Sequence, residues 1–259
     1  MINKDTKLFV SVSSHPGNFG TSLYNEAFKV LGVNAIYEAR KCENSFQFVE
    51  YVERLKCGEF SGISVSMPFK KLANYFVDLK LDNGMVLTDN ANTLILEKDK
   101  RTRAFNTDVD GFRKSCEGIL KDTKTAFVIG RGAVSDSICY VLDNCGIKYR
   151  DRHPSRFGPI PFSEIDDYDL LINASPLGMD QFPDNLFSKQ VLSQCRYVFD
   201  VVNKKETNLV KLARELKKPV VSGPMMCLEG MCRQFQLYTK LEESPRKIFE
   251  KVMREKDFI

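Results

Sequence analysis

The feature that most constrains the fold is an apolar run that ends in a glycine turn and continues as a helix. Thr125–Ile129 has the pattern of a buried strand, Gly130 and Gly132 follow it, and Ala133–Asn144 has helical apolar spacing. In such a unit the first glycine permits a sharp turn and the second lets the backbone approach a pyrophosphate, which the start of the helix attracts. Ser135 stands where the dinucleotide fingerprint has Gly or Ala, and a plain strand-to-helix turn shares this pattern.

Strand and helix patterns alternate along the whole chain, which predicts an α/β fold whose second half is a Rossmann-like, doubly wound parallel sheet. The expected strands are Lys7–Ser13, Ala35–Ala39, Gly62–Ser66, Thr93–Leu96, Thr102–Phe105, Thr125–Ile129, Ile147–Arg150, Leu170–Asn173, Tyr197–Val202 and Pro219–Val221. The expected helices are Thr21–Leu31, Ser45–Leu55, Asp110–Leu120, Ala133–Asn144, Asn208–Leu216 and further helices after Met226.

We expect two domains with a site in the cleft between them. Residues 1–105, completed by C-terminal helices in residues 226–259, form an α/β substrate-binding domain, and residues 106–225 form a dinucleotide-binding domain. Ligands of open parallel sheets bind at the carboxyl edge of the strands, where the strand order reverses.

Composition excludes several classes of function. The 38 basic and 34 acidic residues leave a net charge of only +4, which argues against a nucleic-acid partner. The basic last helix keeps that alternative open, although a solvated helix face is the commoner interpretation. No apolar run approaches the ~18 residues of a membrane span, and the start is too short for a signal peptide, so we expect a cytoplasmic protein.

Cysteine and histidine usage limits the chemistry. The eight cysteines are scattered without a Cys-x-x-Cys pair, and the two histidines are too few for a His-rich metal site. We therefore expect buried free thiols and no metal, and acid–base chemistry must come from Lys, Asp, Glu or Tyr.

The segment after the next strand gives two opposed signals on the coenzyme. Asp151 lies 21 residues after Gly130, where a carboxylate accepts hydrogen bonds from the ribose of NAD. Arg150, Arg152 and Arg156 flank it, and guanidinium groups suit the 2′-phosphate of NADP. Both coenzymes stay open here, as does a plain charged loop.

Two short motifs supply a candidate catalytic pair. Lys70 follows a strand end in Ser64–Lys70, and Asp108 opens a helix in Asn106-Thr107-Asp108. Each alone is more often a solvated lysine or a helix cap. Together with other motifs in the same order, they resemble the shikimate dehydrogenase family over nearly the whole chain. The matching segments are Ser64–Lys70 (family Asn-Val-Thr-x-Pro-x-Lys), Ala91–Thr93 (Val-Asn-Thr), Asn106–Gly111 (Asn-Thr-Asp-x-x-Gly), Gly130–Ala133 (Gly-Ala-Gly-Gly), Asn173–Met179 (Asn-Ala-Thr-x-x-Gly-Met), Asp200–Thr207 and Gly223–Phe235.

The resemblance implies an NADP-dependent oxidoreductase of aromatic amino acid biosynthesis that interconverts 3-dehydroshikimate and shikimate. Lys70 and Asp108 would form the catalytic pair beside the reacting carbon, and Ser66 and Asn92 would bind substrate. The residues implied on the coenzyme side are Gly130, Gly132, Ala133, Asp151, Arg152, Arg156, Ser175, Gly178 and Met226.

The chain departs from the family on the substrate side. Asn18 and Gly20 align with the two serines that bind the substrate carboxylate, and Thr21 or Ser22 would have to supply a hydroxyl from a displaced position. Asn203 aligns with the pocket tyrosine. Each lost hydrogen bond to a charged group costs ~1.5–3 kcal/mol. We therefore expect weak turnover of shikimate itself and a related cyclic hydroxy acid as substrate.

Two further positions depart from the family pattern. Gly230 aligns with the family's glutamine near the end of the chain, and Met225 replaces a glycine near the nicotinamide. On the adenine side, the prolines between Arg156 and Leu170 predict a truncated or non-helical crossover.

The alternative is a small-molecule-binding or regulatory homologue that has lost catalysis. Its partner would still be a small molecule, and NAD remains open as coenzyme beside NADP. The sequence is compatible with a monomer or a homodimer.

Overall fold

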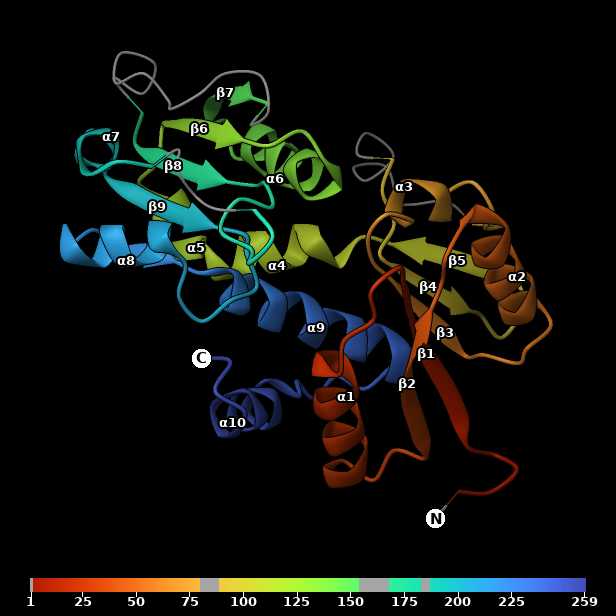
Figure 1. Ribbon diagram of the computed structural model, residues 1–259. Helices are drawn as coiled ribbons and strands as arrows, with labels where there is room; N and C mark the ends of the chain where they lie inside the picture. Colours follow the sequence, from red (N-terminus) through yellow and green to blue (C-terminus); the bar gives the residue numbers. More distant parts are fainter. Residues whose placement is uncertain (1, 80–88, 154–167, 183–186) are drawn as a thin grey trace. The chain divides into compact units, whose positions relative to one another are not determined.

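A computed structural model describes residues 2–79, 89–153, 168–182 and 187–259 (Figure 1). The chain divides into two compact units. The first comprises residues 1–107 and 231–257, and the second residues 108–230 with 258–259. The long helix α9 (Gly223–Thr239) begins in the second unit and ends in the first.

The first unit is built on a mixed five-stranded sheet in the order β2-β1-β3-β4-β5. Strands β1, β2 and β3 run parallel, whereas β3–β4 and β4–β5 are antiparallel pairs. The strands are β1 (Lys7–Ser13), β2 (Ala35–Lys41), β3 (Gly62–Val65), β4 (Thr93–Leu96) and β5 (Thr102–Phe105). The helices wholly in this unit are α1 (Phe19–Val30), α2 (Ser45–Lys56), α3 (Lys70–Ala73) and α10 (Arg246–Glu255).

Helices cover both faces of this sheet (Figure 1). On one face, Phe48 and Leu55 of α2 join a buried cluster with Val10 of β1. On the other, Phe9 of β1 packs on Phe28 of α1 at a centroid distance of 5.7 Å. Successive residues of β1 thus face opposite cores, as the period of a strand requires.

The second unit contains a parallel five-stranded sheet in the order β10-β9-β8-β6-β7. The strands are β6 (Thr125–Ile129), β7 (Lys148–Arg152), β8 (Leu170–Asn173), β9 (Tyr197–Asp200) and β10 (Val220–Val221). The helices are α4 (Thr107–Ser115), whose first residue is the last of the first unit's opening segment, α5 (Glu117–Leu120), α6 (Ala133–Asn144), α7 (Lys189–Ser193) and α8 (Asn208–Glu215). Strand β6 has β7 on one side and β8 on the other, so the strand order reverses at β6, which defines a doubly wound sheet.

Alternate residues of this sheet also face two cores. Phe127 of β6 and Val198 of β9 join buried residues of α7 and α8. The next residue along β9, Phe199, packs edge-on against Phe112 of α4, with centroids 4.9 Å apart. The expected α/β class and the Rossmann-like parallel sheet are confirmed. In the described residues no helix has the length and apolarity that a membrane crossing needs.

The expected helix over Asp110–Leu120 is wrong in one respect, because the segment forms two helices. Helix α4 starts earlier, at Thr107, and ends at Ser115, and Cys116 between it and α5 has φ −104° and ψ 5°. The Ser115 hydroxyl donates to the Phe112 carbonyl at 3.2 Å. Such local bonds compete with the helix ladder, which accounts for the interruption.

Candidate functional site

The turn after β6 is shaped by one glycine. Gly130 has φ +142°, and a Cβ atom placed there would lie 2.4 Å from the Ala174 carbonyl oxygen. The Gly130 N–H donates to the Arg152 carbonyl at 2.9 Å, and the Ser135 hydroxyl donates to the Gly130 carbonyl at 2.8 Å. Only glycine combines this backbone conformation with so close an approach. Ser135, which departs from the fingerprint, bonds to the turn itself.

The start of α6 leaves room for a ligand. Gly132 is its N-cap, makes no side-chain cap bond, and would place a Cβ with nothing within 4 Å. Ala133 is the first helical residue. A 12-residue helix whose first N–H groups face an open glycine turn fits a pyrophosphate. These residues of the second unit therefore fit a dinucleotide.

An ion pair lies beside this turn. The Arg131 Nε atom donates to Asp151 Oδ2 at 2.5 Å. Asp151 belongs to β7 and pairs in register with Val128 of β6. Arg152, the last residue of β7, is 91% buried. Its carbonyl oxygen accepts the hydrogen bond from the Gly130 N–H described above. Arg156 and the expected truncated crossover fall outside the described residues.

A buried polar network closes the carboxyl ends of β8 and β9. The Asn173 side chain donates to Asp200 Oδ1 at 2.9 Å and accepts from the Ser175 hydroxyl at 2.6 Å. Thr207 donates to the other oxygen of Asp200. Burial raises the pKa of the Asp200 carboxyl above its usual value, against the hydrogen bonds it accepts. The Ser175 hydroxyl thus points toward the end of β8, where its bond to Asn173 stabilises the loop after that strand.

Close packing accounts for two other members of the proposed coenzyme set. Gly178 has φ +101°, and a Cβ atom placed there would lie 3.3 Å from the methyl group of Thr207. Met226 is buried on α9, and its carbonyl oxygen would lie 2.6 Å from a Cβ on Gly111 of α4. The glycine of the Asn-Thr-Asp-x-x-Gly motif therefore lets α4 and α9 approach each other.

In the first unit, Lys70 is the first residue of α3 and is half-buried. Its carbonyl accepts from the Ala91 N–H at 2.9 Å, which ties α3 to the segment before β4. Ser66 is exposed just after β3, and its N–H donates to the Val12 carbonyl at 3.0 Å. Lys70 and Ser66 thus both follow the carboxyl end of β3.

Asn92 fastens the start of α4 to the sheet. Its Oδ1 accepts from the Thr107 N–H at 2.9 Å, and its Nδ2 donates to the Thr107 hydroxyl at 3.1 Å. Thr93 also donates its hydroxyl to Asn92 Oδ1, at 2.9 Å. Asp108 directly follows Thr107 and is half-buried in the first turn of α4. The Asn92 side chain therefore fixes the backbone that carries Asp108.

The first turn of α1 contains the two displaced hydroxyls. Ser22 donates its hydroxyl to the Asn18 carbonyl at 3.1 Å. The Thr21 hydroxyl oxygen is buried and has no hydrogen-bond partner among the described residues. Asn18 occupies the N-cap position, yet its side chain makes no cap bond. Of the two hydroxyls, Ser22 is committed to its own helix.

A group of side chains that sequence reasoning missed lies next to this turn. We call Tyr24, Tyr37, Ser64, Gln234 and Tyr238 the tyrosine cluster. The Ser64 hydroxyl donates to Gln234 Oε1 at 2.8 Å and accepts from the Tyr37 hydroxyl at 2.7 Å. The Tyr24 hydroxyl reaches the same Gln234 oxygen at 2.6 Å, and the Tyr238 hydroxyl lies 2.8 Å from Ser64.

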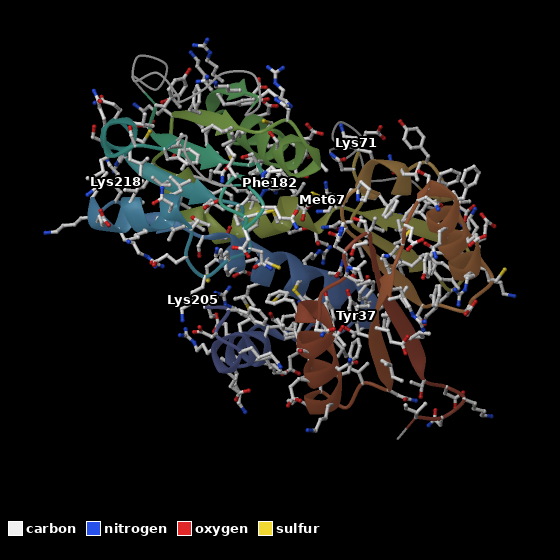
Figure 2. The ribbon with its side chains drawn as sticks, in the orientation of Figure 1. Tyr37, Met67, Lys71, Phe182, Lys205 and Lys218 are labelled. Atoms are coloured by element: carbon white, nitrogen blue, oxygen red, sulfur yellow. The ribbon has the colours of Figure 1, made fainter. Side chains whose placement is uncertain are left out.

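The cluster includes a position of the family's lysine motif. Ser64 aligns with the motif's asparagine, and its hydroxyl is engaged with Tyr37 and Gln234. Tyr37 also stacks on Tyr24 at 4.3 Å between centroids, and Figure 2 shows it beside α1. Gln234 lies one helical turn after Gly230, the position that aligns with the family's glutamine. Residues four apart lie on the same face of a helix, so a glutamine four positions after Gly230 was the sequence signal that could have indicated Gln234.

The buried cysteines are poor candidates for catalytic nucleophiles. All eight cysteines are free, but the expectation that they are buried is wrong for Cys57 and Cys145, which are exposed. Burial raises the pKa of Cys116 and of Cys195 to about 12. A thiol with so high a pKa is a poor nucleophile at neutral pH. Among the described residues, no group of three or more His, Cys, Asp or Glu side chains is arranged to hold a metal ion.

Comparisons with known proteins agree with this architecture. Residues 19–94 match the family model described as the shikimate dehydrogenase substrate binding domain. The shikimate dehydrogenase-like protein of Haemophilus influenzae is 28% identical, over 96% of this chain and 97% of that protein. A shikimate dehydrogenase (NADP(+)) of Pelagibacter ubique is 26% identical, over 85% and 88% of the two chains. The solved structure of a shikimate 5-dehydrogenase-like protein superposes with a TM-score of 0.84 at 25% identity, over 98% of both chains.

Two α/β units, one with the glycine turn of a dinucleotide fold, define the class as a two-domain protein of the Rossmann type. Within this class, the match to the substrate-binding domain and the relatives that span nearly the whole chain point to one family. Together these findings support a divergent relative of the shikimate dehydrogenases, similar to them over nearly the whole chain.

Proposed function

We propose that this protein is an NADP-dependent oxidoreductase that interconverts a cyclic hydroxy acid of the shikimate type and its ketone. Shikimate itself is a weak substrate in this proposal. The first unit binds the substrate and the second the dinucleotide. The relatives named as NADP-dependent shikimate dehydrogenases support the reaction class. The open turn at Gly132 supports the binding of a dinucleotide.

Lys70 and Asp108 are the proposed catalytic pair. A dinucleotide held at the Gly130–Ala133 turn would supply the hydride for reduction or accept it in the reverse direction. Lys70 donates a proton to the ketone oxygen as it takes on negative charge, and takes the proton back in the reverse direction. Asp108 orients the substrate by accepting a hydrogen bond from its hydroxyl. Their roles depend on placement, since a catalytic group must be within hydrogen-bond reach of the proton that it transfers.

The observation that carries this proposal is the pair of hydrogen bonds between Asn92 and Thr107, at 2.9 and 3.1 Å. They hold Thr107, the residue before Asp108, at the start of β4. Because the Asn92 amide fixes the backbone at Thr107, it limits the movement of the Asp108 carboxylate, as a catalytic role for Asp108 requires. Asn92 has the further proposed role of contacting a ring hydroxyl.

The test is a reduced-nicotinamide absorbance assay with NADP+ or NAD+ and either shikimate or quinate. Wild type is measured beside Lys70→Ala and Lys71→Ala, its exposed neighbour. We expect weak turnover by wild type and by Lys71→Ala, and a loss of at least ~100-fold in Lys70→Ala. Equal turnover by Lys70→Ala and wild type would refute the assignment of Lys70.

A second candidate function is a small-molecule-binding homologue without catalysis. The bond between Ser64 and Tyr37 favours it, because a hydroxyl at a motif position is engaged within the protein. Thermal stabilisation by shikimate or quinate without turnover under any condition would favour this alternative. Turnover that Lys70→Ala abolishes would exclude it.

We propose that the protein acts in the cytoplasm as a monomer or homodimer on a small molecule and without nucleic acid. The near balance of 38 basic and 34 acidic residues supports the last point. Sedimentation and a DNA-binding assay at low salt test these statements.

A further inference from the structure

Beside the glycine turn, the second unit presents one positive and one negative side chain in contact. Arg131 projects from the turn between β6 and α6, and Asp151 is the penultimate residue of β7. Their charged groups are 2.5 Å apart, and the side chains are 53% and 39% exposed. Both are thus open to a ligand at the edge of the sheet.

The face on which Asp151 lies follows from its neighbour two residues earlier. Tyr149 and Asp151 share one face of β7, because side chains alternate along a strand. The Tyr149 hydroxyl contacts Asp143 of α6 at 3.3 Å, so this face is the one that α6 covers. Arg150 and Arg152 lie on the other face of β7 by the same alternation. Arg131 reaches Asp151 from the turn between β6 and α6.

The Arg131–Asp151 pair lies where a doubly wound sheet binds its ligand. Ligands bind beyond the carboxyl ends of the strands where the strand order reverses, and here that strand is β6. A carboxylate at the end of the next strand meets the ribose hydroxyls of a dinucleotide. A guanidinium at the same place forms charge-assisted bonds with a 2′-phosphate.

We propose that the Arg131–Asp151 ion pair sets the choice between the 2′-phosphorylated and the unphosphorylated dinucleotide. This inference rests on the proposed function, since it requires that the second unit binds a dinucleotide. Asp151 accepts from the ribose 2′-hydroxyl of NAD and repels a phosphate. Arg131 opposes that repulsion and binds the phosphate of NADP, so each member of the pair favours a different coenzyme.

The two residues therefore act in opposite directions, which a merely structural ion pair would not do. Removing the charge of Asp151 should favour the phosphorylated coenzyme, and removing Arg131 should favour the other. A contact that only stabilised the fold would weaken the binding of both coenzymes together. The ratio of the two dissociation constants is the quantity that separates these cases.

The experiment is a fluorescence titration of the full chain with NADPH and with NADH. The chain has no tryptophan, which simplifies reading the emission of the bound coenzyme. Asp151→Asn should raise the preference for NADPH over NADH at least tenfold. Arg131→Ala should lower it at least tenfold. Asp151→Ser repeats the removal of the charge with a smaller side chain, and thermal unfolding checks that each variant is folded.

The matched control is Lys189–Glu215, a pair in the same unit with its charged atoms 2.8 Å apart and exposures of 62% and 40%. Glu215→Gln and Lys189→Ala change the net charge as the test variants do, and should leave the preference unchanged. Ratios within threefold of wild type in both Asp151→Asn and Arg131→Ala would overturn the inference while leaving the proposed function standing. A folded wild type that binds neither coenzyme would overturn both.

Discussion

The ring of Tyr37 lies against Gly20, so that a Cβ atom at position 20 would come within 3.3 Å of the tyrosine Cε1. The ring also stacks on Tyr24, and its hydroxyl donates a hydrogen bond to Ser64. Gly20 aligns with the second serine of the family's carboxylate-binding motif. A tyrosine therefore occupies the space beside the position from which that serine would act.

This contact predicts that a serine cannot simply be restored. Gly20→Ser should destabilise the protein by about 1–2 kcal/mol, because crowding of a fixed ring exceeds the small gain in helix propensity. Urea unfolding measures the change. Gly17→Ser, at a position with nothing within 4 Å, is the control and should be near neutral. An equal cost of Gly20→Ser in a Tyr37→Ala background would show that the ring is not its cause.

The tyrosine cluster makes a second prediction, centred on Gln234. This buried side chain accepts from Tyr24 and Ser64 and donates to Thr93. Gln234→Met keeps the volume but leaves those partners without it, which should cost about 2–4 kcal/mol in unfolding free energy. Gln236→Met on the same helix removes only a bond to the Glu242 carbonyl and should cost less than ~0.5 kcal/mol. Similar costs for the two variants would contradict the role of the cluster.

Local periodicity was sufficient for the second unit's central elements. The strand Thr125–Ile129 and the helix Ala133–Asn144 have the predicted bounds, because a buried run, a glycine turn and an apolar helix face all lie within about twenty residues. The short helices α3 and α7 were missed. Helix α3 is a single turn, and a four-residue segment does not show a helical period.

Contacts between segments far apart in the chain could not be predicted from the sequence. Ser64 and Gln234 are 170 positions apart, and no pattern in either segment indicates that they share a hydrogen bond. Likewise Asp151 and its neighbouring arginines left the coenzyme open, since the strand alternation and the Arg131 contact come only with the fold. The catalytic roles of Lys70 and Asp108 remain predictions.

The two glycines of the turn should separate stability from ligand binding. Gly130→Ala would bring a Cβ within 2.4 Å of the Ala174 carbonyl at φ +142°, and we expect a loss of about 2–5 kcal/mol in stability. Gly132→Ala meets nothing within 4 Å and should change stability by less than ~1 kcal/mol. It should nevertheless weaken NADPH binding at least tenfold, because its methyl group enters the space left for a pyrophosphate. Calorimetry and fluorescence titration give the two readouts, and unchanged NADPH affinity in Gly132→Ala would contradict this placement.

Asp78 gives a prediction about the acid limb of stability. Its Oδ2 accepts from the Thr102 N–H and from the Thr102 hydroxyl, both at 2.8 Å, where β5 begins. The hydrogen bond from the Thr102 backbone, more than any other influence, lowers the pKa of the Asp78 carboxyl below 3.8. The folded state thus binds fewer protons than the unfolded state in this window, and the stabilisation is present above pH 3.8 and lost as the pH falls through the folded pKa.

Asp78→Asn should accordingly cost about 1 kcal/mol near neutral pH, a value reduced for the exposure of the carboxylate to solvent. The cost arises because an amide oxygen is a weaker acceptor than a carboxylate for the two Thr102 donors. Urea unfolding of both proteins from neutral pH to below the folded pKa should show the difference shrinking toward zero. Glu50→Gln, at an exposed position of α2, is the control and should track wild type throughout. A difference between Asp78→Asn and wild type that stayed constant down to the acid end would mean that ionisation of Asp78 does not contribute to stability.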